Sequence, residues 1–216
     1  MAKNSELENA MKRYIDSDES NRAESGTCNR LRELLKNESV NSRYDLLMNV
    51  RGDKYSPWTG LHEAAVVNDL ESIRYMLDGF PSDKKYDVLK IKNNLGNTPL
   101  HSAAYRGYSS IITYLMTDLS QQQKYDIFKI QDEDGDTALH RASSASRVEV
   151  YRVIAASVPY RLLLELLNIK NNRGKSAADI RPELKDEFPL SIAHGTIIIK
   201  FHVKQLISLK YFKLKE

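Results

Sequence analysis

The sequence predicts an all-α fold, a solenoid of helix–turn–helix units with short hairpin tips and an extra short helix in each unit. The main observation is a motif at Thr98–His101 that recurs 39 residues earlier, at Thr59–His62, and 39 residues later, at Thr137–His140. A decayed copy follows at Ser176–Asp179 after the same interval. A fixed period of this size is typical of stacked repeats, in which each unit buries its apolar face against its neighbours. Glycines keep the same period, as Gly96, Gly135 and Gly174.

The composition excludes several classes of protein. The 216 residues are 41% hydrophobic and 28% charged, with a net charge of +3, and so small a charge does not indicate a nucleic-acid partner. The single cysteine, Cys28, rules out an internal disulfide framework and suits a reducing compartment. No apolar run approaches the roughly 18 residues of a membrane span, and the polar first residues do not resemble a signal peptide. A cytoplasmic location is therefore expected.

Residues 1–40 are expected to form a helical N-terminal cap or degenerate repeat. Two segments place apolar residues on one helical face, and neither carries the recurring motif. Thr27 or Asn29 is expected to cap the second of these helices. The terminal unit of an array needs one polar face, which explains the missing motif. The apolar residues are Leu7, Met11, Tyr14 and Ile15 in the first helix and Leu31, Leu34 and Leu35 in the second.

The repeat array is expected to span residues 41–181. In each unit the motif begins a short first helix, where Pro99 is tolerated because an N–H in the first turn has no intrahelical partner. A tight turn at Asn68, Gly107 or Ser146 leads to a second helix, whose apolar residues form the core between units. Clear units lie near 55–91, 92–130 and 131–169, and a partial unit covers 170–181.

Each unit is longer than the common two-helix repeat because a further segment follows its second helix. Residues 82–89 and 120–128 share a serine, a polar run, the pair Tyr-Asp and two apolar residues, and related segments occur at 42–47 and 159–164. Serine before such a run is typical of a helix N-cap. We therefore expect a third short helix in each unit, on the outer, convex side of the solenoid.

Residues 182–216 form a non-repeat tail that is basic and amphipathic. Pro182 and Pro189 interrupt any long helix, and residues 196–216 mix apolar side chains with five lysines. The β-branched start of this segment favours a strand, whereas the later spacing favours an amphipathic helix, and the pattern does not decide between them. Packing of the tail on the last repeat is favoured over contact with a membrane surface or a partner.

The motif Gly-x-Thr-Pro-Leu-His-x-Ala-Ala around Thr98 resembles the ankyrin repeat, although the usual ankyrin period is about 33 residues. The resemblance covers roughly residues 40–181. It implies a non-enzymatic scaffold that binds another protein through the concave face, at hairpin tips and first helices. Trp58 either packs on the N-terminal cap or contacts that partner. The free positions are Tyr55, Trp58, Val66, Val67, Asn94, Leu95, Asn97, Tyr105, Arg106, Glu133, Asp134, Asp136, Arg173 and Lys175.

No catalytic residue, cofactor site or metal site is expected. The histidines of the motif recur once per unit, too far apart to share a zinc ion at ~2.0–2.1 Å, so a hydrogen bond to backbone and to the nearby threonine is the preferred interpretation. The alternating acids Asp132, Asp134 and Asp136 lack the glycine and glutamate that a calcium loop needs at its sixth and twelfth positions. They are interpreted as an acidic hairpin tip.

Two alternatives to a simple binding scaffold stay open. One is an adaptor or secreted effector whose C-terminal tail recruits ubiquitin machinery or a membrane, which would place the protein in a host cytosol. The other is an inhibitor that masks a transcription factor. In each case the expected partner is another protein, not nucleic acid, and the chain is expected to be a monomer.

Overall fold

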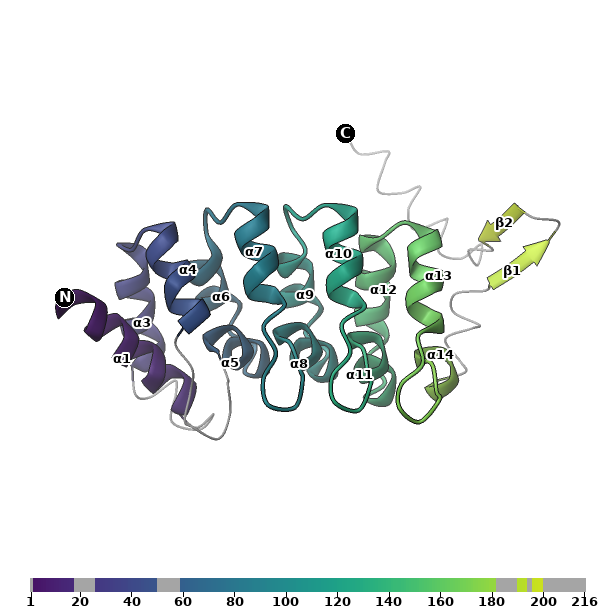
Figure 1. The fold of residues 1–216 in the computed structure, drawn as a ribbon, viewed down its shortest axis with the longest axis horizontal. Coiled ribbons are helices and arrows are strands. Elements are labelled where there is room, and N and C mark those ends of the chain that lie inside the picture. The colour runs from purple at the N-terminus through teal and green to yellow at the C-terminus, as the bar shows by residue number, and fades with distance from the viewer. Residues whose placement is uncertain (1, 18–25, 50–58, 182–189, 194–195, 200–216) are drawn as a thin grey trace, which may run out of the picture.

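The helices stack side by side into an elongated all-α solenoid, as predicted (Figure 1). The computed structural model describes residues 2–17, 26–49, 59–181, 190–193 and 196–199. The expectations for Tyr55, for Trp58 and for most of the tail lie outside these ranges. Helices α1 and α3 come first, and three helices per unit follow in a regular order, with one short pair of strands after the array.

The helices fall into three repeating sets and an N-terminal pair. The pair is α1 (Ala2–Asp16) and α3 (Thr27–Lys36). The first helices are α5 (Gly60–Val66), α8 (Pro99–Arg106), α11 (Ala138–Ser144) and α14 (Ala177–Ile180). The second helices are α6 (Leu70–Leu77), α9 (Ser109–Leu115) and α12 (Val148–Ser157). The third helices are α4 (Val40–Asn49), α7 (Ser82–Leu89), α10 (Gln121–Phe128) and α13 (Tyr160–Asn168).

The core runs through the stack because the same positions are buried in successive units. Ala64, Ala103 and Ala142 are fully buried, and their small side chains allow the first helices to approach one another closely. Isoleucines of the second helices, such as Ile73 and Ile112, complete the interior. Apolar contact between units is therefore continuous along the solenoid.

Helices α1 and α3 cover the N-terminal end of this core. Their predicted apolar face is buried, and Arg32 of α3 binds Asp69 at 2.6 Å and Glu71 at 2.5 Å in the next unit. The Tyr14 hydroxyl also donates to Asp69 at 3.0 Å. The predicted cap of α3 was wrong: Gly26 is the N-cap, with φ of 65°, and Thr27 is the first helical residue.

Each first helix begins with a threonine and a histidine that bind one another. In α8 the Thr98 backbone N–H donates to Nδ1 of His101 at 3.1 Å, and the Thr98 hydroxyl lies 2.8 Å from the same atom. The other ring nitrogen, Nε2, lies 3.1 Å from the carbonyl oxygen of Asp136 in the next unit. A carbonyl only accepts, so Nε2 carries the proton and Nδ1 is the acceptor.

The same arrangement recurs in the neighbouring units, and we call it the histidine bridge. His62 reaches the carbonyl of Asn97 at 2.9 Å, and His140 reaches that of Lys175 at 3.0 Å. The predicted bonds to backbone and threonine are confirmed. The histidine therefore caps its own helix and also fixes the hairpin loop of the following unit.

The hairpin loops touch one another through their backbones. The Glu133 N–H donates to the Leu95 carbonyl at 3.1 Å, and the Asn172 N–H donates to that of Asp134 at 3.0 Å. This approach requires glycine at the loop turn. Gly96 has a φ of 72°, and a Cβ there would stand 2.7 Å from the Glu133 backbone nitrogen.

The predicted third helices are present as α4, α7, α10 and α13, and in α4 and α7 a basic residue binds the end of a second helix. Arg43 of α4 donates to the carbonyls of Tyr75 and Asp78 at 2.7 and 2.6 Å. Lys85 of α7 likewise donates to the carbonyls of Tyr114 and Thr117, at 3.0 and 2.9 Å. A cation at this end satisfies carbonyls that have no intrahelical partner and complements the helix dipole.

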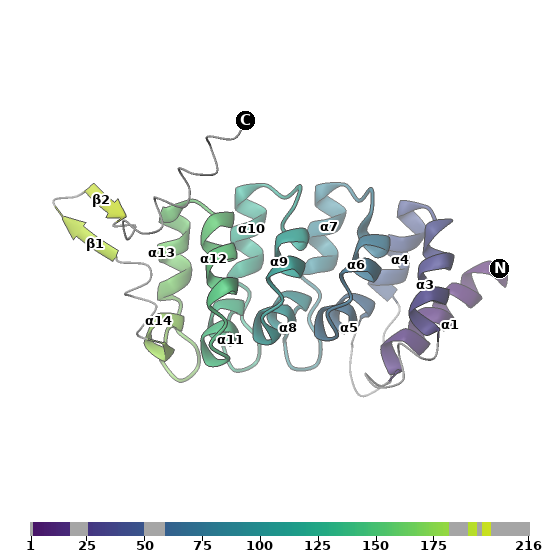
Figure 2. The ribbon, with the colours of Figure 1, turned by 180° about the vertical axis from the view of Figure 1, so that it is seen from behind.

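The third helices form a row beside the second helices, away from the edge where first helices and hairpin loops lie (Figures 1 and 2). The predicted serine cap is confirmed for α10, where the Gln123 N–H donates to Ser120 at 3.2 Å. It is wrong for α7, which has Pro81 at the N-cap and Ser82 as its first residue.

After the array, β1 (Leu190–Ala193) and β2 (Thr196–Ile199) pair in antiparallel fashion, with Leu190 opposite Ile199. The start of the tail segment is therefore a strand, and residues 200–216 lie outside the described part of the chain. Within the described ranges, no helix combines the length and apolar character needed to cross a bilayer.

Two glycines at equivalent positions test the contact between hairpin loops. Gly96 and Gly174 both have positive φ, but a Cβ on Gly174 would meet no atom within 4 Å. Gly96→Ala should therefore lower the free energy of unfolding by about 1–3 kcal/mol more than Gly174→Ala, because only the first substitution forces neighbouring backbones apart. Urea denaturation of both variants measures the difference. Equal losses would contradict the loop packing.

The histidine bridge predicts a loss of stability in acid. Burial lowers the pKa of His101 from 6.5 to about 4. Above pH 6.5 the ring is neutral in both states, whereas between 6.5 and 4 only the unfolded chain gains a proton. The free energy of unfolding should then fall by about 1.4 kcal/mol per pH unit from this residue. His101→Gln, followed by urea titration across the same pH range, should show a shallower slope, and an unchanged slope would contradict the bridge.

Candidate functional site

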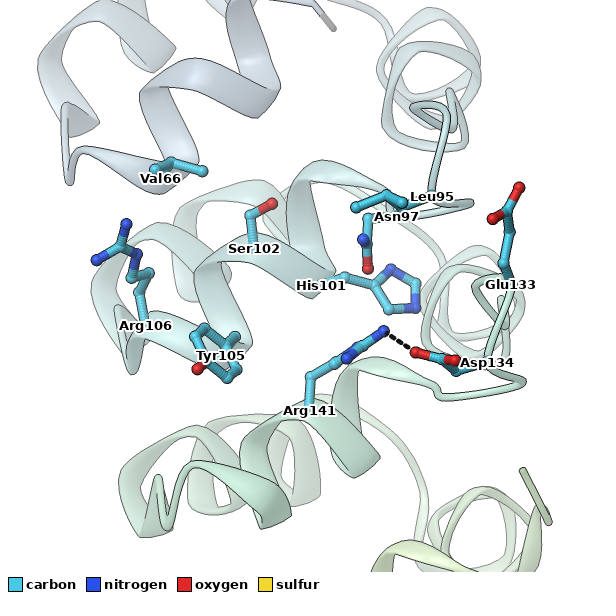
Figure 3. Close-up of a pocket in the computed structure, with 10 residues that line it drawn as sticks. All are labelled: Val66, Leu95, Asn97, His101, Ser102, Tyr105, Arg106, Glu133, Asp134 and Arg141. Carbon is cyan, nitrogen blue, oxygen red and sulfur yellow. Dashed lines mark hydrogen bonds and ion pairs between the residues drawn. The ribbon is translucent and has the colours of Figure 1, made fainter. Parts of the chain in front are cut away.

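A groove of about 530 Å³ lies between the hairpin tips and the first helices of adjacent units. Its walls come from α5, α8 and α11 and from the loops that precede α8 and α11 (Figure 3). The stacking of first helices and the loop contacts described above fix these walls. The lining residues are Val66, Leu95, Asn97, His101, Ser102, Tyr105, Arg106, Glu133, Asp134 and Arg141.

The groove exposes two large apolar side chains. Leu95 is 54% exposed and Tyr105 is 52% exposed, and these two are the exposed large hydrophobic residues of the described chain. Leu95 comes from a hairpin tip and Tyr105 from the last turn of α8, so that they flank the groove from different elements (Figure 3). Single exposed apolar residues are ordinary, but both line one groove, and such clustering marks a binding surface.

The floor of the groove is polar and holds two side chains that are available for hydrogen bonds. Asn97 and Ser102 are half-buried, and neither side chain has a hydrogen-bond partner within the described residues. His101 also reaches the floor, but both of its ring nitrogens are used by the histidine bridge. Because burial lowers its pKa to about 4, the ring is neutral near pH 7 and has no free nitrogen to act as a base.

An acidic hairpin tip forms one end of the groove, as predicted. The carboxylates of Asp132, Asp134 and Asp136 lie within 4.8 Å of one another. Arg141 of α11 contacts all three, at 2.6 Å to Asp132, 3.0 Å to Asp134 and 3.7 Å to Asp136. The protein therefore supplies its own counter-ion for this cluster. Burial acts against the charge of Arg141, but the hydrogen bond and charge of Asp132 raise its pKa.

The structure brings half of the predicted contact positions into the groove. Asp136 is not among them, because it is only 2% exposed and its carboxylate accepts a hydrogen bond from Asn171 at 2.7 Å. Asp136 therefore binds the next hairpin loop, and its carboxylate is not available to a partner. The positions in the groove are Val66, Leu95, Asn97, Tyr105, Arg106, Glu133 and Asp134, whereas Val67, Asn94, Arg173 and Lys175 lie outside its lining.

Three lining residues were not predicted, namely His101, Ser102 and Arg141. Ser102 and Arg141 occupy the same position of the repeat, directly after the histidine. In the motif Thr-Pro-Leu-His-x-Ala-Ala this is the variable residue between invariant neighbours. A repeat position that is free to vary next to buried positions is the signal that would have identified them.

The chain matches a family model described as ankyrin repeats, three copies, over residues 22–126 and 61–172. These two overlapping matches cover most of the helical array. No curated protein matches the chain.

The exposed groove residues should contribute little to folding. Leu95→Ala and Tyr105→Ala are expected to change the free energy of unfolding by less than about 0.5 kcal/mol each, as surface substitutions do. Leu100 of α8 is 1% exposed, and Leu100→Ala should lower the free energy of unfolding by about 2–5 kcal/mol. Guanidinium denaturation midpoints compare the three variants. A large loss at Tyr105 would show that its ring is part of the core.

Proposed function

This chain belongs to the ankyrin repeat family, and from that premise we propose that it is a non-enzymatic scaffold that binds another protein through the groove between its hairpin tips and first helices. Ankyrin repeats are generally protein–protein interaction modules, and the family is typically without catalytic activity. The Ser102 hydroxyl in the groove has no hydrogen-bond partner among the described residues, so no neighbouring base activates it as a nucleophile, and the surface suits recognition.

The observation that carries the proposal is that Leu95 and Tyr105, the exposed large hydrophobic residues of the described chain, both line one groove. Burying a large apolar side chain contributes about 1.5–3 kcal/mol, and tyrosine and arginine are enriched among the residues that dominate binding energy. Tyr105 and Arg106 are adjacent at the end of α8 and both line the groove. A partner that covers this end would bury residues of the types that contribute most at protein interfaces.

The rigidity of the walls supports the same function. The histidine bridge and the loop-to-loop bonds hold the groove without a ligand, so a partner need not order them on binding. Preorganised surfaces bind with a smaller entropic penalty. The residues that line the groove are then free to determine which partner is bound.

We further propose that the protein acts in the cytoplasm, which suits its single cysteine, Cys28, and that it is a monomer. The division into a cap at 1–40, an array at 41–181 and a tail at 182–216 is part of this proposal. An adaptor or an inhibitor would bind through the same groove. Deleting residues 190–216 separates a simple binding module, which keeps its partner and its activity, from an adaptor, which keeps its partner but loses its downstream effect.

Affinity capture with full-length variants tests the proposal. The groove variant is Leu95→Ala with Tyr105→Ala, and the control is Tyr86→Ala with Tyr125→Ala on the third helices, which removes two aromatic rings from another surface. The groove variant should lose at least about tenfold of the captured partner, as expected when a central contact is removed. The control should keep it. The reverse pattern would place the interface on the third helices and refute the proposal.

A further inference from the structure

We infer that the occupant of the groove is an extended peptide segment of the partner, with a lysine or arginine at the acidic hairpin tip and an apolar side chain beside Tyr105. This inference rests on the proposed function and specifies the chemistry of the partner.

The hairpin tip retains negative charge after its internal pairing. Glu133 is exposed and forms no ion pair within the described residues, and the Asp134 side chain is 65% exposed. Together with Asp132 and Asp136 these are four carboxylates, whereas the guanidinium groups that contact them are those of Arg141 and Arg173. The exposed rim therefore favours a cation, and a buried contact there would be complementary in charge.

The two ends of the groove differ in character. Tyr105 lies at the end of α8, across the groove from Glu133 and Asp134 (Figure 3). A bound segment would therefore place its basic residue at the hairpin tips and its apolar side chain beside Tyr105. A segment with an acidic residue at the tips would meet like charge there.

The polar floor favours an extended backbone over a helix. Asn97 offers both an amide donor and a carbonyl acceptor, and Ser102 offers a hydroxyl, and both side chains lack partners within the described residues. A helix satisfies its own peptide groups, whereas an extended segment presents free N–H and C=O groups that these side chains can bind. A volume of about 530 Å³ also suits a few residues better than a whole helix.

Selection of unstructured peptides from a phage-displayed library on the full-length protein tests the inference. The selected peptides should carry a lysine or arginine near an apolar residue, and their affinity should fall as salt rises. Glu133→Gln should weaken their binding roughly twofold to fivefold, the effect of losing one ion pair at an exposed site. The matched control is Glu149→Gln on α12, which makes the same change of charge outside the groove and should leave affinity unchanged.

Tyr105→Ala separates the two proposals. One outcome is that Tyr105→Ala abolishes peptide binding, but the peptides carry no basic residue or bind Glu133→Gln with unchanged affinity. This outcome would refute the cationic segment and leave the groove as the binding site. If the peptides bind Tyr105→Ala with unchanged affinity, the proposed function itself is refuted. If no peptide is enriched, or if single-stranded nucleic acid binds instead, an extended protein segment is not the occupant.

Discussion

The bond from each motif histidine to a carbonyl of the following unit is the interaction on which the rest of this structure depends. One imidazole satisfies the N-terminus of its own first helix through Nδ1 and the next hairpin loop through Nε2. Both of these elements contribute to the walls of the groove. If the ring were lost, the buried Thr98 N–H would lack its partner, and the Asp136 carbonyl would keep only its bond from the Asp132 N–H. An unsatisfied buried group is more costly than the net value of the bond. Local folding and the geometry of the site are therefore controlled by the same side chain.

The third helices secure the opposite edge of the solenoid. Arg43 and Lys85 each reach forward to the carbonyl end of a second helix in the following unit, while the histidine bridges act at the edge that holds the hairpin loops. Hydrogen bonds therefore join adjacent units on both sides of their apolar core. The additional residues of the repeat supply the third helix, whose cation in α4 and α7 caps a helix of the neighbouring unit. A stack held in this way leaves the exposed groove positions free to differ from unit to unit.

Local patterns in the sequence predicted the features that depend on short spacing. The Thr-x-x-His bond joins residues three apart, and the positive φ of Asn68, Gly107 and Ser146 follows from the tight turn between two helices. Features that depend on distant units were missed. Asp136 was expected at the surface, but it is buried, and its carboxylate binds Asn171, 35 residues later. Asn97 at the same repeat position is half-buried and lines the groove. The roles of Arg43 and Lys85 were hidden in polar runs because their acceptors lie in other helices.

The central claim is that the groove, and not the face of the second helices, receives the partner. Photo-crosslinking measures this directly. A benzophenone amino acid replaces Ser102 on the groove floor in one variant and Thr113, which is exposed on α9, in another. Both are irradiated as full-length proteins in extract of the cells that contain the protein. The account predicts a discrete covalent adduct from position 102 that is competed by unlabelled protein, and none from position 113. An adduct from position 113 with none from position 102 would contradict it.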